Sequence, residues 1–408
     1  MTALLARTRR LDADVDLLGF AGRDGMLFER GRSGLAGRGC AARLPWPGGY
    51  PAAAAGTVAE VLAGIEVDDE VRLPGCGPVG FGTLPFTPGA SSELVVPAVV
   101  AGRADDGTRW ITTIGEAAPD ADPPDLGAEV ERLPAVRRFT VTAQRDPEDW
   151  CALVERATKA MAGGTLHKVV LARQIDIAAD RPIDRLAVLE RLRSAYPGCH
   201  LVSIAGFVAA SPELLVSVAG DIVRSHPMAG TAPRGGDPTT DQRLAASLLA
   251  SSKDRQEHQI TIDMVHDTLL PWCSYLDYEA EPSVVAVANV QHLATMVEGR
   301  LSQPAPSVLE LVAALHPTPA VAGWPRDEAV AWIAEHEGFD RRRYAGTAGW
   351  VDSAGNGTWA VSVRCAEVDG SAARVWAGNG IVADSDPSTE LAETRSKLQA
   401  LLSAIVRP

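Results

Sequence analysis

Two acidic segments that lie far apart in the chain limit how it can fold. Asp254 and Glu257 belong to the first segment, and Glu390, Glu393 and Lys397 belong to the second. Residues three, four or seven positions apart share one face of an α-helix, so each segment predicts a polar stripe on a helix. If the stripes converge in the fold, they form a Mg²⁺ site, because this ion is usually held by one or two protein carboxylates and several waters. The alternative is two solvated helix faces.

Length and charge restrict the class of protein. At 408 residues the chain exceeds the usual size of one hydrophobic core, and 46% of the residues are apolar, which allows a large folded body. The formal net charge is −14, and no basic run stands out beyond Arg7–Arg10. We therefore expect neither a nucleic-acid partner nor an anionic membrane, and a small-molecule enzyme fits better.

The location and redox state follow from what the sequence lacks. Leu4 and Leu5 precede Arg7, which reverses the order of a secretory signal, and no apolar run approaches membrane-spanning length. We expect a cytoplasmic protein. The cysteines form no C-x-x-C pair, so reduced thiols are expected rather than a zinc site or a disulfide framework: Cys40, Cys76, Cys151, Cys199, Cys273 and Cys365.

The N-terminal part, residues 1 to about 130, predicts short antiparallel strands separated by Gly/Pro turns, with one helical stretch near Val58–Leu62. The Pro- and Asp-rich stretch from Ala118 to Leu126 is the best linker candidate. The second part, 135–408, has clearer helix and strand signals. We expect helices over Trp150–Ala162, Ile183–Ala195, from Asp254 and from Ser385 onward, and strands over His167–Ile175, Ala360–Ala366 and Arg374–Ala377.

Arg364 is a candidate anion-binding residue. In a strand over 360–366 it would share a face with the small residues Ala360 and Ser362, which leaves room for a bound anion. An edge-strand arginine in solvent would explain the pattern equally well. The Gly378-Asn379-Gly380 turn before the last helix permits close approach of a ligand, although a plain turn is also possible.

Seven ordered blocks resemble the chorismate-utilising enzymes, the family of isochorismate synthases, salicylate synthases, anthranilate synthase large subunits and aminodeoxychorismate synthases. The resemblance is strong over roughly 140–402, and the N-terminal part is similar to the same family's first region. The blocks are His226–Gly235, Ser252–His258, Asn289–Thr295, Leu315–Gly323, Tyr344–Trp350, Ala377–Val382 and Glu390–Lys397. The resemblance implies an α+β fold of curved antiparallel sheets flanked by helices, with 1–130 and 135–408 intertwined in one structural domain.

The resemblance also implies a Mg²⁺ cofactor and a set of site residues. Glu257 and Glu393 would bind the metal directly, and Asp254 and Glu390 would bind it through waters. The substrate-binding residues carried over from the family are Arg364, Tyr344 and the Gly378 and Gly380 backbone at the enolpyruvyl carboxylate, Lys397, Gly230 and Thr231 at the ring carboxylate, and the pocket residue His292.

Lys168 indicates which nucleophile is used, and Glu213 is the candidate general acid. Ammonia-using members generally lack a lysine at the position of Lys168, and water needs a base, which a lysine supplies when its surroundings lower its pKa. Glu213 matches the family's general acid, which requires a raised pKa from burial or from nearby negative charge. The alternatives are a strand-end lysine and a surface glutamate in contact with solvent.

Ala320 separates isochorismate release from further reaction. Salicylate synthases place a threonine near this position and go on to eliminate pyruvate, so Ala320 favours release of isochorismate. Asn379, between the two glycines, and Trp324, after Gly323, depart from the small residues usual in the family. We expect both departures to affect affinity more than reaction type.

The sequence thus predicts a Mg²⁺-dependent isochorismate synthase, an isomerase that acts on chorismate as a monomer without a glutaminase subunit. A salicylate synthase is the nearest alternative. A glutaminase-coupled amination enzyme and a non-catalytic chorismate-binding protein are more distant ones. The product could feed menaquinone, a catecholate siderophore or salicylate.

Overall fold

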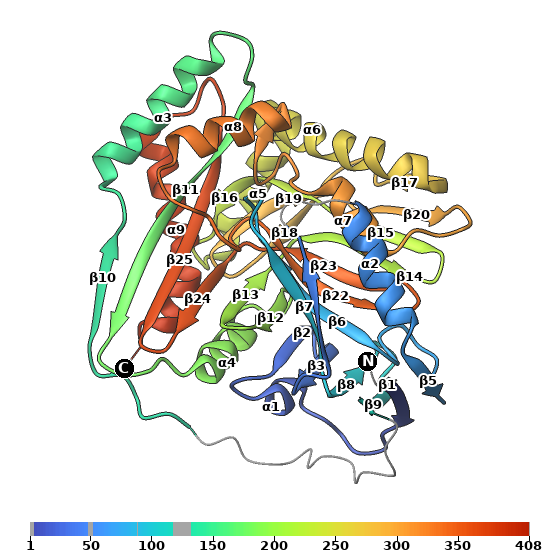
Figure 1. The fold of residues 1–408 in the computed structure, drawn as a ribbon. Coiled ribbons are helices and arrows are strands. Elements are labelled where there is room, and N and C mark those ends of the chain that lie inside the picture. The colour runs from blue at the N-terminus through green and yellow to red at the C-terminus, as the bar shows by residue number, and fades with distance from the viewer. Residues whose placement is uncertain (1–3, 48–51, 88, 117–131, 408) are drawn as a thin grey trace.

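The computed structural model describes residues 4–47, 52–87, 89–116 and 132–407, and within them the strands form three sheets (Figure 1). Neighbouring strands pair antiparallel, as β11 does with β25, whereas β1 and β5 pair in parallel. The predicted α+β class with curved antiparallel sheets is therefore confirmed.

The strands, in their order across each sheet, have the following bounds. The thirteen-stranded sheet consists of β10 (Phe139–Ala143), β11 (Lys168–Ala179), β25 (Ala372–Ile381), β24 (Cys365–Asp369), β13 (Phe207–Ser211), β12 (His200–Ile204), β2 (Met26–Arg30), β3 (Ser33–Arg38), β8 (Val99–Arg103), β9 (Arg109–Glu116), β1 (Leu4–Arg10) and β5 (Glu66–Asp69), with β21 (Gly323–Trp324) paired to β11. The nine-stranded sheet consists of β17 (Cys273–Tyr278), β20 (Val297–Leu301), β15 (Ile222–His226), β14 (Leu214–Ala219), β23 (Gly357–Val361), β22 (Thr347–Asp352), β6 (Val79–Leu84), β7 (Ser92–Val96) and β4 (Ala42–Trp46). The three-stranded sheet consists of β16 (Met228–Pro233), β19 (Val290–Ala294) and β18 (Ser283–Ala286).

Helices cover each sheet. Those that pack on the thirteen-stranded sheet are α1 (Leu17–Ala21), α3 (Pro147–Met161), α4 (Arg185–Ala195), α8 (Arg326–His336) and α9 (Pro387–Ile405). The nine-stranded sheet carries α2 (Ala52–Ala63) and α7 (Val308–Leu315), and the three-stranded sheet carries α5 (Pro238–Ala250) and α6 (Ser252–Leu269), which ends in a short 3₁₀ turn, η1 (Leu270–Trp272). Figure 1 shows α2 and α7 side by side on the edge of the molecule away from α9.

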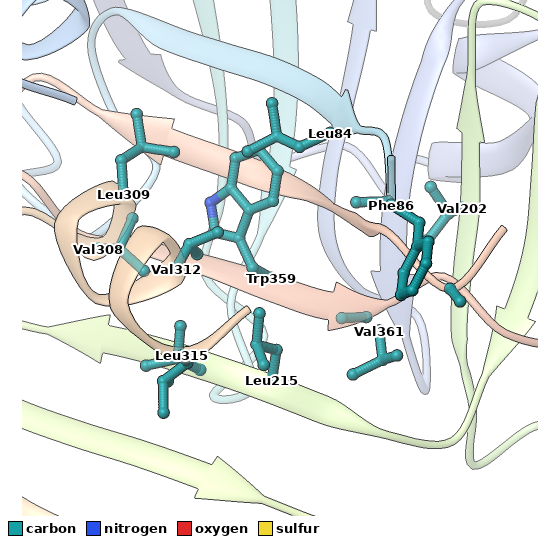
Figure 2. Close-up of a cluster of buried hydrophobic side chains, with 14 of the residues drawn as sticks. Leu84, Phe86, Val202, Leu215, Val308, Leu309, Val312, Leu315, Trp359 and Val361 are labelled. Carbon is teal, nitrogen blue, oxygen red and sulfur yellow. The ribbon is translucent and has the colours of Figure 1, made fainter. Parts of the chain in front are cut away.

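The alternation of side chains along the strands separates the two larger hydrophobic clusters of the core. In β13, Phe207 belongs to the larger cluster, whereas Val208 belongs to the cluster under α1, α4 and α9. Figure 2 shows the part of the larger cluster around Trp359 of β23, which is fully buried and lies among Leu84 of β6 and Val312 of α7. Apolar burial on both faces of a sheet holds its strands in one register, because a slip of one residue would turn every apolar side chain to the wrong side.

Most elements predicted from periodicity are present. The helices expected over 150–162 and 183–195, the helix from Asp254 and the helix after Ser385 correspond to α3, α4, α6 and α9, and the N-terminal helical stretch corresponds to α2. The linker candidate at 118–126 lies outside the described residues. Strands of the N-terminal part lie in both large sheets, among them β1 to β3 in one and β4, β6 and β7 in the other.

The strand predicted over 360–366 was wrong. β23 ends at Val361 and β24 begins at Cys365, and the chain passes from the nine-stranded sheet to the thirteen-stranded sheet between them. Arg364 has φ +50°, a left-handed conformation that strands do not adopt. A side-chain pattern of period two cannot reveal such a turn. Within the described residues, no helix is long and apolar enough to cross a membrane.

Candidate active site

A cavity of about 130 Å³ lies where the three sheets meet, and every site residue named from the sequence lines it. These residues are Lys168, Glu213, Gly230, Thr231, Asp254, Glu257, His292, Ala320, Tyr344, Arg364, Gly378, Gly380, Glu390, Glu393 and Lys397. They come from β11, β16, β19, β25, α6, α9 and the segments between elements. We call this space the central cavity.

Two of these residues stand where the chain changes sheet. Glu213 lies between β13 of the thirteen-stranded sheet and β14 of the nine-stranded sheet, and Arg364 lies between β23 and β24, which cross in the opposite direction. Backbone hydrogen bonds tie the two crossings together, from Val361 to the Glu213 carbonyl at 3.1 Å and from Ala210 to the Arg364 carbonyl at 3.1 Å. Residues at such crossings leave the pleat, so their side chains turn into the space between the sheets.

The two acidic stripes converge on the central cavity. Helix α6 starts at a Ser251 N-cap, whose side chain accepts a hydrogen bond from the Asp254 amide, and α9 starts at an Asp386 N-cap followed by Pro387. Asp254 and Glu390 therefore lie in first turns, where a negative charge also complements the helix dipole. Glu390 is buried, the other three carboxylates are half-buried, and all four line the cavity, so neither stripe is a fully solvated helix face.

Three of the four carboxylates have polar partners in the protein. Glu257 Oε2 lies 3.6 Å from Lys168 Nζ, and Glu393 Oε1 lies 2.6 Å from Lys397 Nζ. Glu390 accepts hydrogen bonds at both oxygens, and its burial together with the nearby Glu393 charge raises its pKa. In the part of the chain that the structure describes, no three His, Cys, Asp or Glu side chains are grouped closely enough to hold a metal ion.

The two glycines of β25 make room for side chains of the cavity wall. A Cβ on Gly380 would lie 2.6 Å from Lys168 Cε, and one on Gly378 would lie 2.7 Å from the Tyr344 hydroxyl. Both distances are shorter than real carbon contacts, so any larger residue would displace Lys168 or Tyr344. The glycines are therefore needed to make room for Lys168 and Tyr344. The sequence suggested only close approach of a ligand.

Glu213 is a buried carboxyl group whose protonation is shifted. Desolvation by burial raises its pKa to about 7, against the opposing effects of a hydrogen bond from the Met228 amide and of the Arg364 and Lys168 charges. Its backbone is fixed by a 3.3 Å hydrogen bond from its own amide to Ser211 Oγ. A carboxyl group with such a pKa can donate a proton near neutral pH.

Arg364 is oriented by a neutral histidine. Arg364 Nη2 lies 2.8 Å from His292 Nε2, and His292 Nδ1 lies 3.2 Å from the Gly230 carbonyl oxygen. A guanidinium can only donate, so Nε2 accepts and the proton is assigned to Nδ1, which donates to Gly230. Burial and the neighbouring positive charges of Arg364 and Lys397 lower the pKa of His292 well below its usual range, in agreement with this neutral tautomer.

The conformation of Gly230 allows β16 to lie close to the start of α6. It has φ +74° and lies at an irregularity of the β16–β19 register between Ala229 and Thr231. A Cβ at Gly230 would lie 3.1 Å from the Asp254 Cβ, so glycine allows the sheet to approach the start of α6 closely. The bulge thus places Thr231 and Asp254 on the wall of the same cavity.

Lys397 is tied to protein acceptors. Its ammonium group donates to the Gly378 carbonyl oxygen at 3.0 Å and to Asn379 Oδ1 at 3.0 Å, and it pairs with Glu393. Burial lowers its pKa, and the Glu393 charge opposes this effect. Three acceptors match the three N–H groups of a lysine, so this side chain joins β25 to α9 before any ligand is present.

Several cavity residues were missed from the sequence. Lys253 lies one helical turn before Glu257, and that i, i+4 spacing could have identified it as a cavity residue. The apolar part of the wall includes Val170, Met228, Val321, Val363 and Trp376, for which the sequence holds no distinguishing signal. Trp324 does not line the central cavity; it is 37% exposed, and its backbone pairs with Lys168.

The chemistry of the wall suits an anionic organic ligand. Four cationic side chains line the central cavity together with five carboxyl groups: Lys168, Lys253, Arg364 and Lys397, and Glu213, Asp254, Glu257, Glu390 and Glu393. Arg364 Nε is buried without a hydrogen-bond partner among the described residues, which leaves a donor for a bound anion. The cavity therefore combines an anion-binding group, a lysine, a protonatable carboxyl group and carboxylates from two helices.

Comparison with known proteins agrees with this geometry. The chorismate binding enzyme family model matches residues 35–406. The isochorismate synthase DhbC of Bacillus subtilis is 37% identical over 363 residues, which cover 86% of this chain and 85% of that protein. The isochorismate synthase EntC of Escherichia coli is 36% identical over 339 residues, 80% of each chain. The solved structure of MenF, the menaquinone-specific isochorismate synthase from Escherichia coli, superposes with a TM-score of 0.81 at 25% identity, covering 98% of this chain and 95% of that one.

Proposed function

The chain belongs to the family of chorismate-binding enzymes, and we propose that it is an isochorismate synthase, which converts chorismate into isochorismate. The observation that carries the proposal is the burial of Lys168 and Glu213 in the same cavity as the two acidic helices. A lysine and a carboxyl group with a pKa of about 7 are the base and the acid that exchange of a hydroxyl group requires.

The donor set of the central cavity fits Mg²⁺. Four carboxylates from α6 and α9 line it, and hard oxygen ligands are those that Mg²⁺ prefers. Glu257 and Glu393 would bind the ion directly, and Asp254 and Glu390 would bind it through waters. Two direct carboxylates are sufficient for Mg²⁺. The ion would offset the two negative charges of chorismate and hold its ring carboxylate.

Lys168 and Glu213 would divide the proton transfers between them. Lys168, as the base, takes a proton from a water whose oxygen bonds to C2 of the substrate ring. The ring double bonds shift, the C4–O bond breaks, and Glu213 supplies the proton with which the C4 hydroxyl leaves as water. One water is consumed and one is released, so the net reaction is an isomerisation. Exchange with solvent returns both side chains to their starting states.

The anion-binding residues would fix the ring between these two groups. Arg364, held by His292, and Tyr344, next to Gly378, would bind the enolpyruvyl carboxylate. Gly230, Thr231 and Lys397 would surround the ring carboxylate. Because Lys397 already has three protein acceptors, we propose that it contributes its charge and holds the strand, rather than offering a free donor.

The product identifies the reaction. We expect the purified protein to form isochorismate from chorismate when Mg²⁺ is present and to lose the activity when the metal is chelated. Ala320 lines the central cavity at the position that we associate with release of isochorismate. Pyruvate and fluorescent salicylate formed without an added lyase would instead establish a salicylate synthase, and ammonia-dependent anthranilate would establish an amination enzyme.

Other aspects stay predictions from the sequence. They are the monomeric state, the absence of a glutaminase subunit and the cytoplasmic location. The relatives include proteins named for vibriobactin, for salicylate biosynthesis and for menaquinone, so the downstream use of the product is open among siderophore, salicylate and menaquinone routes.

A further inference from the structure

Asn379 stands between the two glycines of β25, and the sequence predicts that it affects affinity. The strand alternation gives a different placement. Gly378 and Gly380 line the central cavity, whereas Asn379 does not; its side chain contacts α9 and is 1% exposed. Asn379 therefore influences the cavity through its contacts with Glu390 and Lys397, which do line it.

Every polar atom of the Asn379 amide has a partner. Nδ2 donates to the backbone carbonyl oxygen of Glu390 at 2.8 Å and to Glu390 Oε2 at 3.0 Å. Oδ1 accepts from Lys397 Nζ at 3.0 Å. An ammonium group can only donate and a carboxylate can only accept, so the orientation of the amide is fixed by its partners.

Ser385 completes the arrangement around Glu390. Its hydroxyl donates to Glu390 Oε1 at 2.8 Å and accepts from the Val382 amide at 3.1 Å. Each oxygen of Glu390 thus has a donor, one from Asn379 of β25 and one from Ser385 just before α9. The carboxylate of Glu390 is held in one orientation although its neighbour Glu393 repels it.

We propose that Asn379 is a positioning residue, which locks the Glu390 carboxylate and the Lys397 ammonium group in one relative arrangement at the metal-binding side of the central cavity. This inference concerns metal binding, and it therefore rests on the proposed function. A neutral amide is suited to this place because it offers donors to a carboxylate and an acceptor to an ammonium group at once. Alanine offers neither, and aspartate would turn an oxygen toward Glu390.

The test measures Mg²⁺ binding by titration calorimetry with MgCl₂ alone, so that its readout does not depend on catalysis. Partners of metal ligands typically contribute 10- to 100-fold to affinity. We therefore expect Asn379→Ala to weaken Mg²⁺ binding about tenfold or more, and Asn379→Asp, which keeps the size of the side chain, to weaken it at least as much. The KM for chorismate should rise, while kcat at saturating Mg²⁺ and chorismate should change less, since Asn379 touches neither Lys168 nor Glu213.

Asn356→Ala is the matched control. The Asn356 amide also donates to a carboxylate, that of Asp352, and accepts a hydrogen bond from the Gly220 amide, but it lies outside the central cavity. Its loss should lower stability and leave the Mg²⁺ affinity unchanged. A Mg²⁺ affinity within twofold of wild type in both Asn379 variants would overturn the inference, and so would an equal weakening in Asn356→Ala.

The two proposals can fail separately. A wild type that binds Mg²⁺ tenfold more tightly than Asn379→Ala but forms no isochorismate supports the positioning role and overturns the proposed function. A wild type that forms isochorismate and binds Mg²⁺ no better than the variants overturns the positioning role alone. A wild type that binds no Mg²⁺ overturns both the metal assignment and this inference.

Discussion

Lys168 Nζ lies 3.6 Å from Glu257 Oε2, an ion pair that joins the start of β11 to α6 inside the central cavity. The lysine is 3% exposed and passes over Gly380, which has no side chain to obstruct it. The proposed base and a proposed metal ligand are thus direct neighbours, although they are far apart in the sequence. A substitution at either residue will therefore change the electrostatic surroundings of the other.

Lys168→Ala tests the base. We expect kcat to fall about 10²–10⁴-fold, because a positioned general base contributes about that much, while chorismate binding is largely kept. Steady-state kinetics and equilibrium binding of chorismate measure the two effects. Lys159→Ala, at an exposed lysine of α3, should behave as wild type. Undiminished turnover in Lys168→Ala would contradict the assignment.

The pH profile tests the acid. Burial raises the pKa of Glu213 to about 7, so kcat/KM for chorismate should fall as the pH rises through about 7 and the proton is lost. Glu213→Gln cannot donate and should lose about 10²–10⁴-fold in kcat. A wild-type profile that stays flat up to pH 9 would exclude Glu213 as the acid.

The stability of Glu213→Gln provides an independent check of the same shift. A raised folded-state pKa means that stability is complete below the unfolded value of 4.5 and is lost as the pH rises through about 7. A glutamine has no charge to bury, so the variant should be at least as stable as wild type at pH 8 in urea unfolding. A clear loss of stability at that pH would mean that the folded protein depends on the carboxylate.

Arg364→Lys tests the carboxylate contact. Lysine keeps the charge but loses the planar guanidinium group, whose Nη2 donates to His292 and whose Nε is buried without a hydrogen-bond partner among the described residues. A charge-assisted hydrogen bond contributes about 1.5–3 kcal/mol, so KM for chorismate should rise about 10- to 100-fold. Arg374→Lys, at a half-exposed ion pair with Asp176, is the control. An unchanged KM would place the carboxylate elsewhere.

Substitution of Arg341 tests whether its buried ion pair stabilises the wall of the central cavity. This arginine is 1% exposed and donates to Glu337, to the Val321 carbonyl and to the Val170 carbonyl. Arg341→Met leaves a buried carboxylate without its partner and should cost about 3–5 kcal/mol in free energy of unfolding. The double variant with Glu337→Leu should recover part of that loss. Equal losses in the single and double variants would contradict the ion-pair explanation.

His200 tests the acid sensitivity of the fold. Both ring nitrogens are buried without a hydrogen-bond partner among the described residues, and burial lowers the pKa to about 3. The unfolded chain takes up a proton near pH 6.5 and the folded chain does not, so stability falls as the pH drops below 6.5. At pH 5 this one group should cost about 2 kcal/mol.

His200→Phe should remove that share of the loss between pH 7 and pH 5, because phenylalanine preserves the aromatic packing against Phe28 without a titrating group. Urea unfolding at the two pH values measures it. His167→Gln, at an exposed histidine, serves as the control and should retain the wild-type pH dependence. The same pH dependence in His200→Phe as in wild type would rule out His200 as the source.

The sequence by itself determined the local elements and the candidate residues. The i, i+3 spacing of Asp254 with Glu257 and of Glu390 with Glu393 is a local signal, and it correctly predicted two acidic helices. The ordered blocks then brought together residues that line one cavity in the fold. Both kinds of information are carried by residue types in sequence and need no coordinates.

Only the tertiary structure decided what each residue contacts. Arg364 leaves the strand pattern because the chain changes sheet there, and Asn379 contacts α9 because that helix packs against β25. The placements of Arg364 and Asn379 depend on contacts between segments far apart in sequence. The local sequence pattern does not reveal these contacts. The partners of Lys168, Lys397 and Glu390 also come from distant segments, and these contacts set the burial and charge of the central cavity.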